Sequence, residues 1–235
     1  MTVLLENYLQ NFIHPFRTQE AHRLARRIRE SIDGQGQLQL ADDSHQKNLE
    51  LKASLTGIGV NLYEAMGISW LFIIVKIIYA LLAMALGVAA FNISEGNSTL
   101  LEILIPAFTV KAQKLLIIFA VGEVVFFPVG IWFYAKIWGT FIKFFGELFD
   151  REKDLREISD EIISGSLTSH LFLLVPVFGS LAQFLSALVF LYAGLRRNLE
   201  LKVPQALMVL IAPVFVIFLL WLMLLVSVML LVSVF

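Results

Sequence analysis

Residues 206–235 form a long apolar run, ALMVLIAPVFVIFLLWLMLLVSVMLLVSVF, thirty residues without a charged side chain. A helix needs about 20 apolar residues to cross the hydrocarbon core of a bilayer, so this run is long enough to span a membrane. The composition agrees: of 235 residues, 58% are hydrophobic and 16% are charged, and the mean hydropathy is +0.80. Soluble domains carry about 25% charged residues. The sequence therefore predicts an all-α, polytopic integral membrane protein.

Four shorter apolar segments precede this run. The first holds a single charge, Lys76, and the second holds only Glu123. The next apolar stretch, residues 162–195, is too long for one crossing at about 1.5 Å per residue, and its Pro176 and Gly179 indicate a turn. A re-entrant hairpin is the alternative to two short spans here. We expect five transmembrane helices, over residues 69–91, 115–135, 162–178, 179–195 and 206–235.

The basic residues between the apolar segments predict the orientation of the chain. Short loops on the cytoplasmic side of a membrane carry an excess of Lys and Arg. With five spans and a cytoplasmic N-terminus, the basic residues after the second span lie in the cytoplasm together with Arg196 and Arg197. With four spans, Arg196 and Arg197 would lie outside. We therefore expect a cytoplasmic N-terminus and a C-terminus outside.

Residues 1–67 are expected to form a cytoplasmic arm in front of a membrane domain over residues 68–235. Within the arm, residues 3–16 and 17–32 each place apolar side chains on one helical face, which is typical of helices that lie in the headgroup region. The second helix carries four arginines that can contact anionic lipid or an acidic helix expected over residues 147–163. These arginines are Arg23, Arg26, Arg27 and Arg29.

Polar side chains inside the expected spans are functional candidates, because burying them in hydrocarbon is costly. Lys76 is near enough to the cytoplasmic surface for its side chain to reach water. Glu123 is not, so it has to be protonated, paired or in contact with a cavity. Lys76 is one candidate partner for Glu123. The intramembrane polar candidates are Lys76, Glu123, His170 and Gln183.

Several classes of chemistry are not expected. The chain has no cysteine, hence no disulfide and no thiolate site, and its net charge of -1 gives no reason to expect nucleic acid. Motifs for nucleotide binding, metalloproteases and serine hydrolases are absent from the sequence. Ser166 and His170 are expected to bond to backbone groups rather than to form a catalytic pair. We expect no enzymatic activity, no cofactor and no metal site.

The C-terminal half carries motifs that resemble a known family. Residues 169–179 read SHLFLLVPVFG, residues 190–197 read FLYAGLRR and residues 203–207 read VPQAL. This pattern is similar to the Yip family of membrane proteins (Ypt/Rab-interacting proteins), over about residues 65–235 and most specifically over 160–215. The residues that carry the resemblance are Pro176, Gly179, Tyr192, Gly194, Leu195 and Ala206.

The resemblance implies a non-enzymatic membrane protein with a cytoplasmic arm and five spans. Eukaryotic members act in vesicle traffic and membrane shaping. Their Asp-Leu-Tyr-Gly-Pro motif is absent here, which favours a bacterial-type member in the inner membrane over a partner of small GTPases.

The expected function is that of a membrane-organising or trafficking-type adaptor. Its expected partners are membrane lipids, especially anionic ones, and a further protein, with a homo-oligomer as an open alternative. The alternative function is a small-solute or ion transporter or channel with Glu123 in a polar path. Polar groups from several helices that converge on one cavity would favour the transporter.

Overall fold

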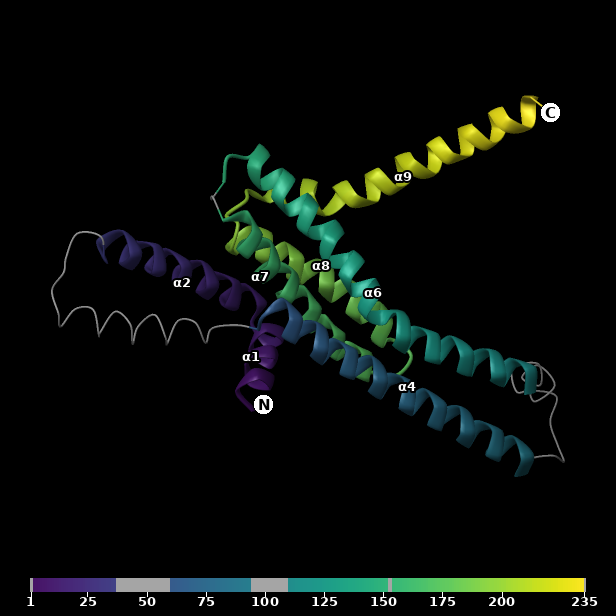
Figure 1. The fold of residues 1–235 in the computed structure, drawn as a ribbon. Helices are drawn as coiled ribbons and strands as arrows, with labels where there is room; N and C mark the ends of the chain where they lie inside the picture. Colours follow the sequence, from purple (N-terminus) through teal and green to yellow (C-terminus); the bar gives the residue numbers. More distant parts are fainter. Residues whose placement is uncertain (1, 37–59, 94–109, 152–153, 235) are drawn as a thin grey trace.

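The computed structural model describes residues 2–36, 60–93, 110–151 and 154–234, and these residues are all-helical (Figure 1). The predicted all-α fold is thus confirmed for this part of the chain. Residues 37–59 of the expected arm lie outside the described residues. The helices are α1 (Thr2–Ile13), α2 (Pro15–Gly36), α4 (Leu62–Ile93), α6 (Val110–Leu148), α7 (Leu155–Leu167), the 3₁₀ helix η2 (Thr168–Leu174), α8 (Gly179–Arg197) and α9 (Val203–Val234).

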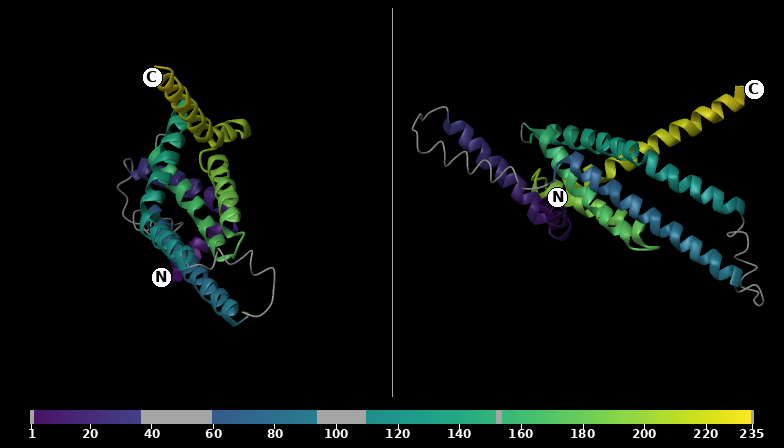
Figure 2. Two further views of the ribbon diagram at one scale, coloured as in Figure 1. Left: turned by 90° about the vertical axis from the view of Figure 1, so that its right-hand side faces the viewer. Right: turned by 60° about the horizontal axis from the view of Figure 1, so that its bottom comes forward.

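Four of the described helices, α4, α6, α8 and α9, are long and apolar enough to cross a membrane. α4 and α6 lie side by side as an antiparallel pair (Figures 1 and 2). α4 begins at Leu62, so it runs across the boundary that the sequence suggested at residue 67. We call the end of the molecule where α1 and α2 lie the arm end, and the opposite end of the α4–α6 pair the far end.

A proline in α6 creates a hydrogen-bonding problem that α4 solves. Pro128 has no N–H group, so the carbonyl of Val124, four residues earlier, lacks its usual donor within the helix. The indole Nε1 of Trp70 in α4 donates to this carbonyl at 3.0 Å. In apolar surroundings a backbone carbonyl has to find its partner inside the protein. Trp70 therefore joins the two helices.

The expected helix over residues 162–178 is two segments instead. α7 begins earlier, at Leu155, and at Thr168 the chain tightens into η2. Ser166 donates to the Ile163 carbonyl and Thr168 to the Gly165 carbonyl, each at 2.7 Å. Such short-range hydroxyl bonds compete for the carbonyls on which an α-helix depends. The serine- and threonine-rich sequence thus explains why the α-helix ends here.

α7, η2 and α8 form an antiparallel hairpin whose turn lies where Pro176 and Gly179 predicted it. The Phe178 N–H donates to the Pro176 carbonyl at 2.8 Å, which closes a tight turn around Val177. Val177 has φ of 67°, an unfavourable conformation for a β-branched residue. A Cβ atom on Gly179 would lie 2.4 Å from the Phe172 carbonyl oxygen, so only glycine fits at this position.

Hydroxyl groups hold this hairpin against α4 and α1. The Leu167 carbonyl accepts hydrogen bonds from Tyr8 at 2.9 Å and from Ser69 at 3.2 Å. At the end of η2, the Leu173 carbonyl accepts a hydrogen bond from Tyr79. The hairpin therefore advances along α4 only as far as Tyr79.

α4 and α6 continue well beyond the hairpin. From Tyr79 to the end of α4 at Ile93 the helix extends a further ~21 Å at 1.5 Å per residue. α6 likewise begins with residues that lie beyond the hairpin. Among the described residues, only α4 and α6 reach the far end, and α9 leads away from this pair at an angle (Figures 1 and 2).

The main apolar core lies at the arm end. It joins the second half of α6, α7, the end of α8 and the start of α9, with Ile142, Ile158 and Leu195 fully buried.

The helix expected over residues 147–163 does not exist as one piece, because α6 ends at Leu148 and α7 starts at Leu155.

α9 stands apart from the rest of the molecule after its first turns. Figure 2 shows its start as a short olive segment and the remainder as a longer segment at an angle to it. Pro213, which removes one helical hydrogen bond, lies near this bend. The side chains of residues 214–231 are all exposed. This apolar length is suited to contact with lipid on every side.

We expect Trp70→Phe to lower the free energy of unfolding by about 1–3 kcal/mol, because the Val124 carbonyl then lacks a donor in apolar surroundings. Pro128→Ala restores an N–H group within α6 that reaches this carbonyl. Trp70→Phe should therefore cost about 1 kcal/mol less in the Pro128→Ala background. Unfolding in detergent compares the four proteins, and equal costs in both backgrounds would contradict the role given to the indole.

Candidate functional site

Polar side chains of the described residues gather in two places. One is the contact of α2 with α7 and with the loop after α8, which we call the arm junction. The other is a cavity between α6 and the hairpin, which we call the membrane pocket. The two are described in turn.

The arm junction is built on one face of α2. Gln19, His22 and Arg26 follow one another at helical spacing, and all three are buried, with Arg26 only 3% exposed. Arg26 Nη1 lies 3.0 Å from Glu161 Oε2 and its Nη2 donates to Asn198 Oδ1 at 2.8 Å. α2 thus turns a polar face, rather than its apolar face, toward the protein.

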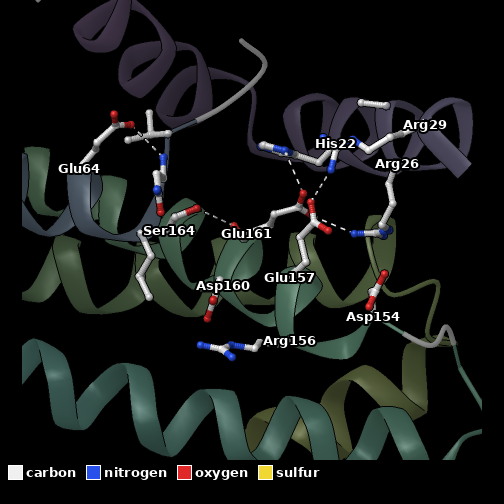
Figure 3. A pocket seen from close by; sticks show the side chains of 14 residues that line it. His22, Arg26, Arg29, Glu64, Asp154, Arg156, Glu157, Asp160, Glu161 and Ser164 are labelled. Carbon is white, nitrogen blue, oxygen red and sulfur yellow. Dashed lines mark hydrogen bonds and ion pairs between the residues drawn. The ribbon is translucent and has the colours of Figure 1, made fainter. Parts of the chain in front are cut away.

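Glu161 of α7 is the centre of the arm junction (Figure 3). Besides Arg26, its carboxylate accepts a hydrogen bond from Asn198 at 2.8 Å, and His22 Nδ1 lies 3.6 Å from Oε1. Gln19 donates to the Glu161 backbone carbonyl at 3.2 Å. Burial alone would raise the pKa of Glu161, but the hydrogen bonds and positive charge of these neighbours outweigh burial and lower it. Glu161 is therefore held as a buried anion.

All four candidate arginines contact carboxylates of the chain itself. Arg29 pairs with Glu157 of α7 at 2.9 Å, beside the Arg26–Glu161 pair. Arg23 and Arg27 both contact Glu200, at 2.5 and 3.0 Å. The acidic partner considered from the sequence is therefore present in α7.

Sequence reasoning missed four members of the arm junction. Asn198 and Glu200 lie in a short loop that carries no motif, and a lone Gln or His on a helix gives no signal without knowledge of its neighbours. Opposite charge on the two helices was the available signal, and it identified α7. The missed residues are Gln19, His22, Asn198 and Glu200.

A cleft of about 660 Å³ lies beside the arm junction, between α2, α7 and the start of α4 (Figure 3). Its lining mixes cations such as Arg156 with anions such as Glu64 and Asp154. Among the described residues, no three His, Asp or Glu side chains are arranged to hold a metal ion. The cleft therefore presents no concentrated charge of either sign.

The membrane pocket brings together three of the four intramembrane polar candidates. It has a volume of about 390 Å³, and Glu123 of α6, His170 of η2 and Gln183 of α8 all line it. The fourth candidate, Lys76 of α4, pairs with Glu123 at 2.6 Å. The candidate partnership of Lys76 and Glu123 is thus present in the structure. Polar groups from four helical segments meet at this site.

Ser166 and His170 bond to backbone groups, as expected. Besides its bond to Ile163, Ser166 Oγ lies 2.9 Å from the Tyr134 hydroxyl. His170 Nδ1 lies 2.8 Å from the Leu167 carbonyl. The described residues show no hydrogen bond between Ser166 and His170, so the geometry of a serine–histidine pair is not present.

The residues that carry the family resemblance occupy packing and turn positions. A Cβ atom on Gly194 would lie 2.7 Å from Ile162 of α7, so this glycine permits close contact between α7 and α8. Leu195 and Ala206 are fully buried in the core at the arm end, and Tyr192 packs against it. Pro176 and Gly179 form the hairpin turn. These residues shape the fold rather than a chemical site.

We expect Glu161→Gln to destabilise the docking of α2 by about 3 kcal/mol, because Arg26 then stays buried without a charged partner. Hydrogen exchange of the α2 amides should become about a hundredfold faster. The matched control is Glu157→Gln on the same helix, whose pair with Arg29 is exposed and is worth less than about 1 kcal/mol. Similar effects of the two substitutions would contradict a central role for Glu161.

The same pair gives a prediction on pH. The pKa of Glu161 is lowered in the folded protein, so its contribution to stability is complete above the ordinary glutamate value near about 4.3. That contribution is lost as the pH falls through the lowered pKa. The difference in thermal midpoint between the wild type and Glu161→Gln should therefore be constant from neutral pH to about 5 and disappear in stronger acid. A difference that persists unchanged in strong acid would contradict this assignment.

Comparison with known proteins gives no relative for the chain: no protein-family model, no curated protein and no solved structure matches it. The resemblance to the Yip family therefore stays a prediction. What is established is that the described residues are all-helical and include four apolar helices suited to a membrane.

Proposed function

We propose that the chain is a non-enzymatic, membrane-organising protein of the Yip type that widens one leaflet of the bilayer. The supporting observation is the unequal cross-section of the described residues. At the arm end, α1, α2, the hairpin, the second half of α6 and the start of α9 pack into one body, and the beginning of α4 lies against its hairpin and α6. At the far end only α4 and α6 continue among the described residues, and α9 leads away from them (Figures 1 and 2).

The depth of the hairpin supports this proposal. We take Trp70 of α4 as the interfacial residue at the arm end, because tryptophan is enriched at membrane–water interfaces. From Trp70 to Tyr79, where the hairpin ends, α4 advances ~14 Å, about half of the ~30 Å hydrocarbon core. The exposed tip residues Val175, Val177 and Phe178 are apolar, with Val177 91% exposed. A tip of this composition is suited to hydrocarbon in the middle of the bilayer.

This geometry favours the re-entrant alternative for residues 162–195. The hairpin then enters and leaves at the arm end, and α4, α6 and α9 cross completely. If both arms of the hairpin crossed the whole membrane, the chain would instead have five spans, and the two ends of the hairpin would still lie on the same side of the membrane. In either case we propose that the arm end is cytoplasmic, in the inner membrane of a bacterium, as the distribution of basic residues predicts.

The arm adds to the asymmetry between the leaflets. α2 docks through its polar face and α1 through Tyr8 and Phe12. Other large apolar side chains remain on the outer surfaces of the two helices: Leu5, Ile13, Phe16 and Leu24 are exposed. Such side chains can enter the headgroup region of the leaflet at the arm end. Anionic lipids of that leaflet are the proposed partners, together with a further protein or a second copy of the chain.

Reconstitution into vesicles tests the proposal that the chain widens one leaflet, which we call the wedge. We expect the full chain to reduce the mean vesicle diameter measured by electron cryomicroscopy, with the arm end on the outer surface of the smallest vesicles. Shortening exposed side chains of the hairpin with Leu181→Ala, Phe184→Ala and Leu185→Ala should weaken this effect, because it narrows the inserted part. Protease access to the arm reports the orientation.

The matched control shortens one Phe and two Leu of similar exposure at the far end, with Leu82→Ala, Leu86→Ala and Phe119→Ala. The wedge predicts that this variant shapes vesicles at least as strongly as the wild type. Equal weakening by both triple variants, or unchanged vesicles with the wild type, would overturn the proposal.

The convergence of Glu123, His170 and Gln183 on one pocket favours transport as the second candidate function. Among the described residues, however, the α4–α6 pair and the separate α9 do not enclose a path across the membrane. Ion or solute flux into vesicles that disappears with Glu123→Gln would support transport, and flux equal to that of protein-free vesicles would count against it.

A further inference from the structure

The membrane pocket is a second feature, and its chemistry does not depend on the proposed wedge. It lies between α6 and the hairpin. Tyr134 lies at the end of the pocket nearer the arm end, and Glu123 lies about 16 Å farther along α6 at helical rise. Two of its lining residues, Phe126 and Glu123, are exposed, so the pocket is open on its α6 side. In the proposed orientation, this side of the pocket is in contact with lipid.

The lining groups are mainly hydrogen-bond acceptors. A carbonyl can only accept, so His170 Nδ1 carries the proton in its contact with the Leu167 carbonyl, and Nε2 of the neutral ring is an acceptor. Ser166 donates to Ile163, so the Tyr134 hydroxyl donates to Ser166 and keeps its own lone pairs for a further donor. Glu123 uses Oε1 for Lys76, and its Oε2 has no hydrogen bond among the described residues.

A buried hydroxyl at the same site also lacks a partner. Ser169 lines the pocket and is fully buried, and its Oγ makes no hydrogen bond with any described residue. Buried polar groups in folded proteins nearly always have a partner. An unsatisfied hydroxyl beside an acceptor-rich cavity points to a ligand that supplies the missing bonds.

The ligand that fits this set carries several N–H donors and a positive charge. A primary ammonium group offers three donors, which match the carboxylate, imidazole and amide acceptors of Glu123, His170 and Gln183. Lys76, which pairs with Glu123, can interact with an anionic group next to that ammonium. A quaternary ammonium has no N–H group and cannot make these bonds.

We propose that the membrane pocket binds the primary ammonium headgroup of an ethanolamine phospholipid from the leaflet at the arm end. The opening toward lipid supports a membrane lipid as the source, and the volume of about 390 Å³ lies in the usual range of ligand pockets. Ethanolamine and choline lipids differ in the N–H donors of the headgroup, so the site distinguishes them.

Native mass spectrometry of the full chain in detergent tests this site. Ethanolamine, N-methyl, N,N-dimethyl and choline phospholipids with identical acyl chains are offered in equal amounts. We expect the ethanolamine lipid to be retained about tenfold more than the choline lipid, the factor that one hydrogen bond to a charged group supplies. Retention should fall as methyl groups replace N–H donors. Equal retention of all four lipids by the wild-type protein would overturn the proposal.

Variants and a soluble competitor locate the site and its source. Glu123→Gln should lower the ratio of retained ethanolamine lipid to choline lipid to about one. Gln183→Leu, which leaves the ion pair of Glu123 intact, should do the same. Glu147→Gln, an exposed carboxylate elsewhere on α6, should leave it at the wild-type value. A preference that survives both pocket variants would overturn the site. If millimolar soluble phosphoethanolamine displaced the lipid, the assignment of the ligand to a membrane lipid would be overturned.

Discussion

Two backbone carbonyls at the two ends of η2, those of Leu167 and Leu173, determine how the rest of the molecule is arranged. The Leu167 carbonyl receives the hydroxyls of Tyr8 and Ser69, and the Leu173 carbonyl receives that of Tyr79. Backbone groups within a bilayer have to be satisfied inside the protein, so irregular backbone in the hairpin requires these donors. The same bonds fix how far the hairpin advances along α4, and with it the difference between the two ends of the molecule.

Polar side chains at the arm end attach α2 to the rest of the protein as well as contacting water. Glu161 joins α7 to α2 and to the loop after α8, and its partners lower its pKa, so that a buried negative charge is retained. Removing one member of such a pair costs more than the pair contributes, because the other charge stays buried. The arm is therefore attached through charge, and its apolar side chains remain available for the membrane surface. Docking and lipid contact use different faces of the same helices.

The sequence was sufficient for the helical class, for the hairpin turn at Pro176 and Gly179, and for the four polar candidates that meet at the membrane pocket. It did not reveal the switch from α7 to η2, because apolar length alone gives no sign that Ser166 and Thr168 compete for backbone carbonyls. Nor did it reveal the buried polar face of α2. Periodicity identified the apolar face, whereas the choice between protein and lipid for each face depends on partners such as Glu161 and Asn198 that are distant in sequence.

The depth of the hairpin tip tests the central claim most directly. The chain has no cysteine, so a single spin label can be placed at Val177→Cys, with reference labels at Glu147→Cys and Lys114→Cys near the two ends of α6. Collision with oxygen and with a water-soluble nickel complex reports the depth of each label in the bilayer. A half-membrane hairpin places the Val177 label roughly 15 Å below the surface at the arm end, with high oxygen and low nickel accessibility. Nickel accessibility equal to that of the Lys114 label would show that the hairpin crosses the membrane and would contradict this account.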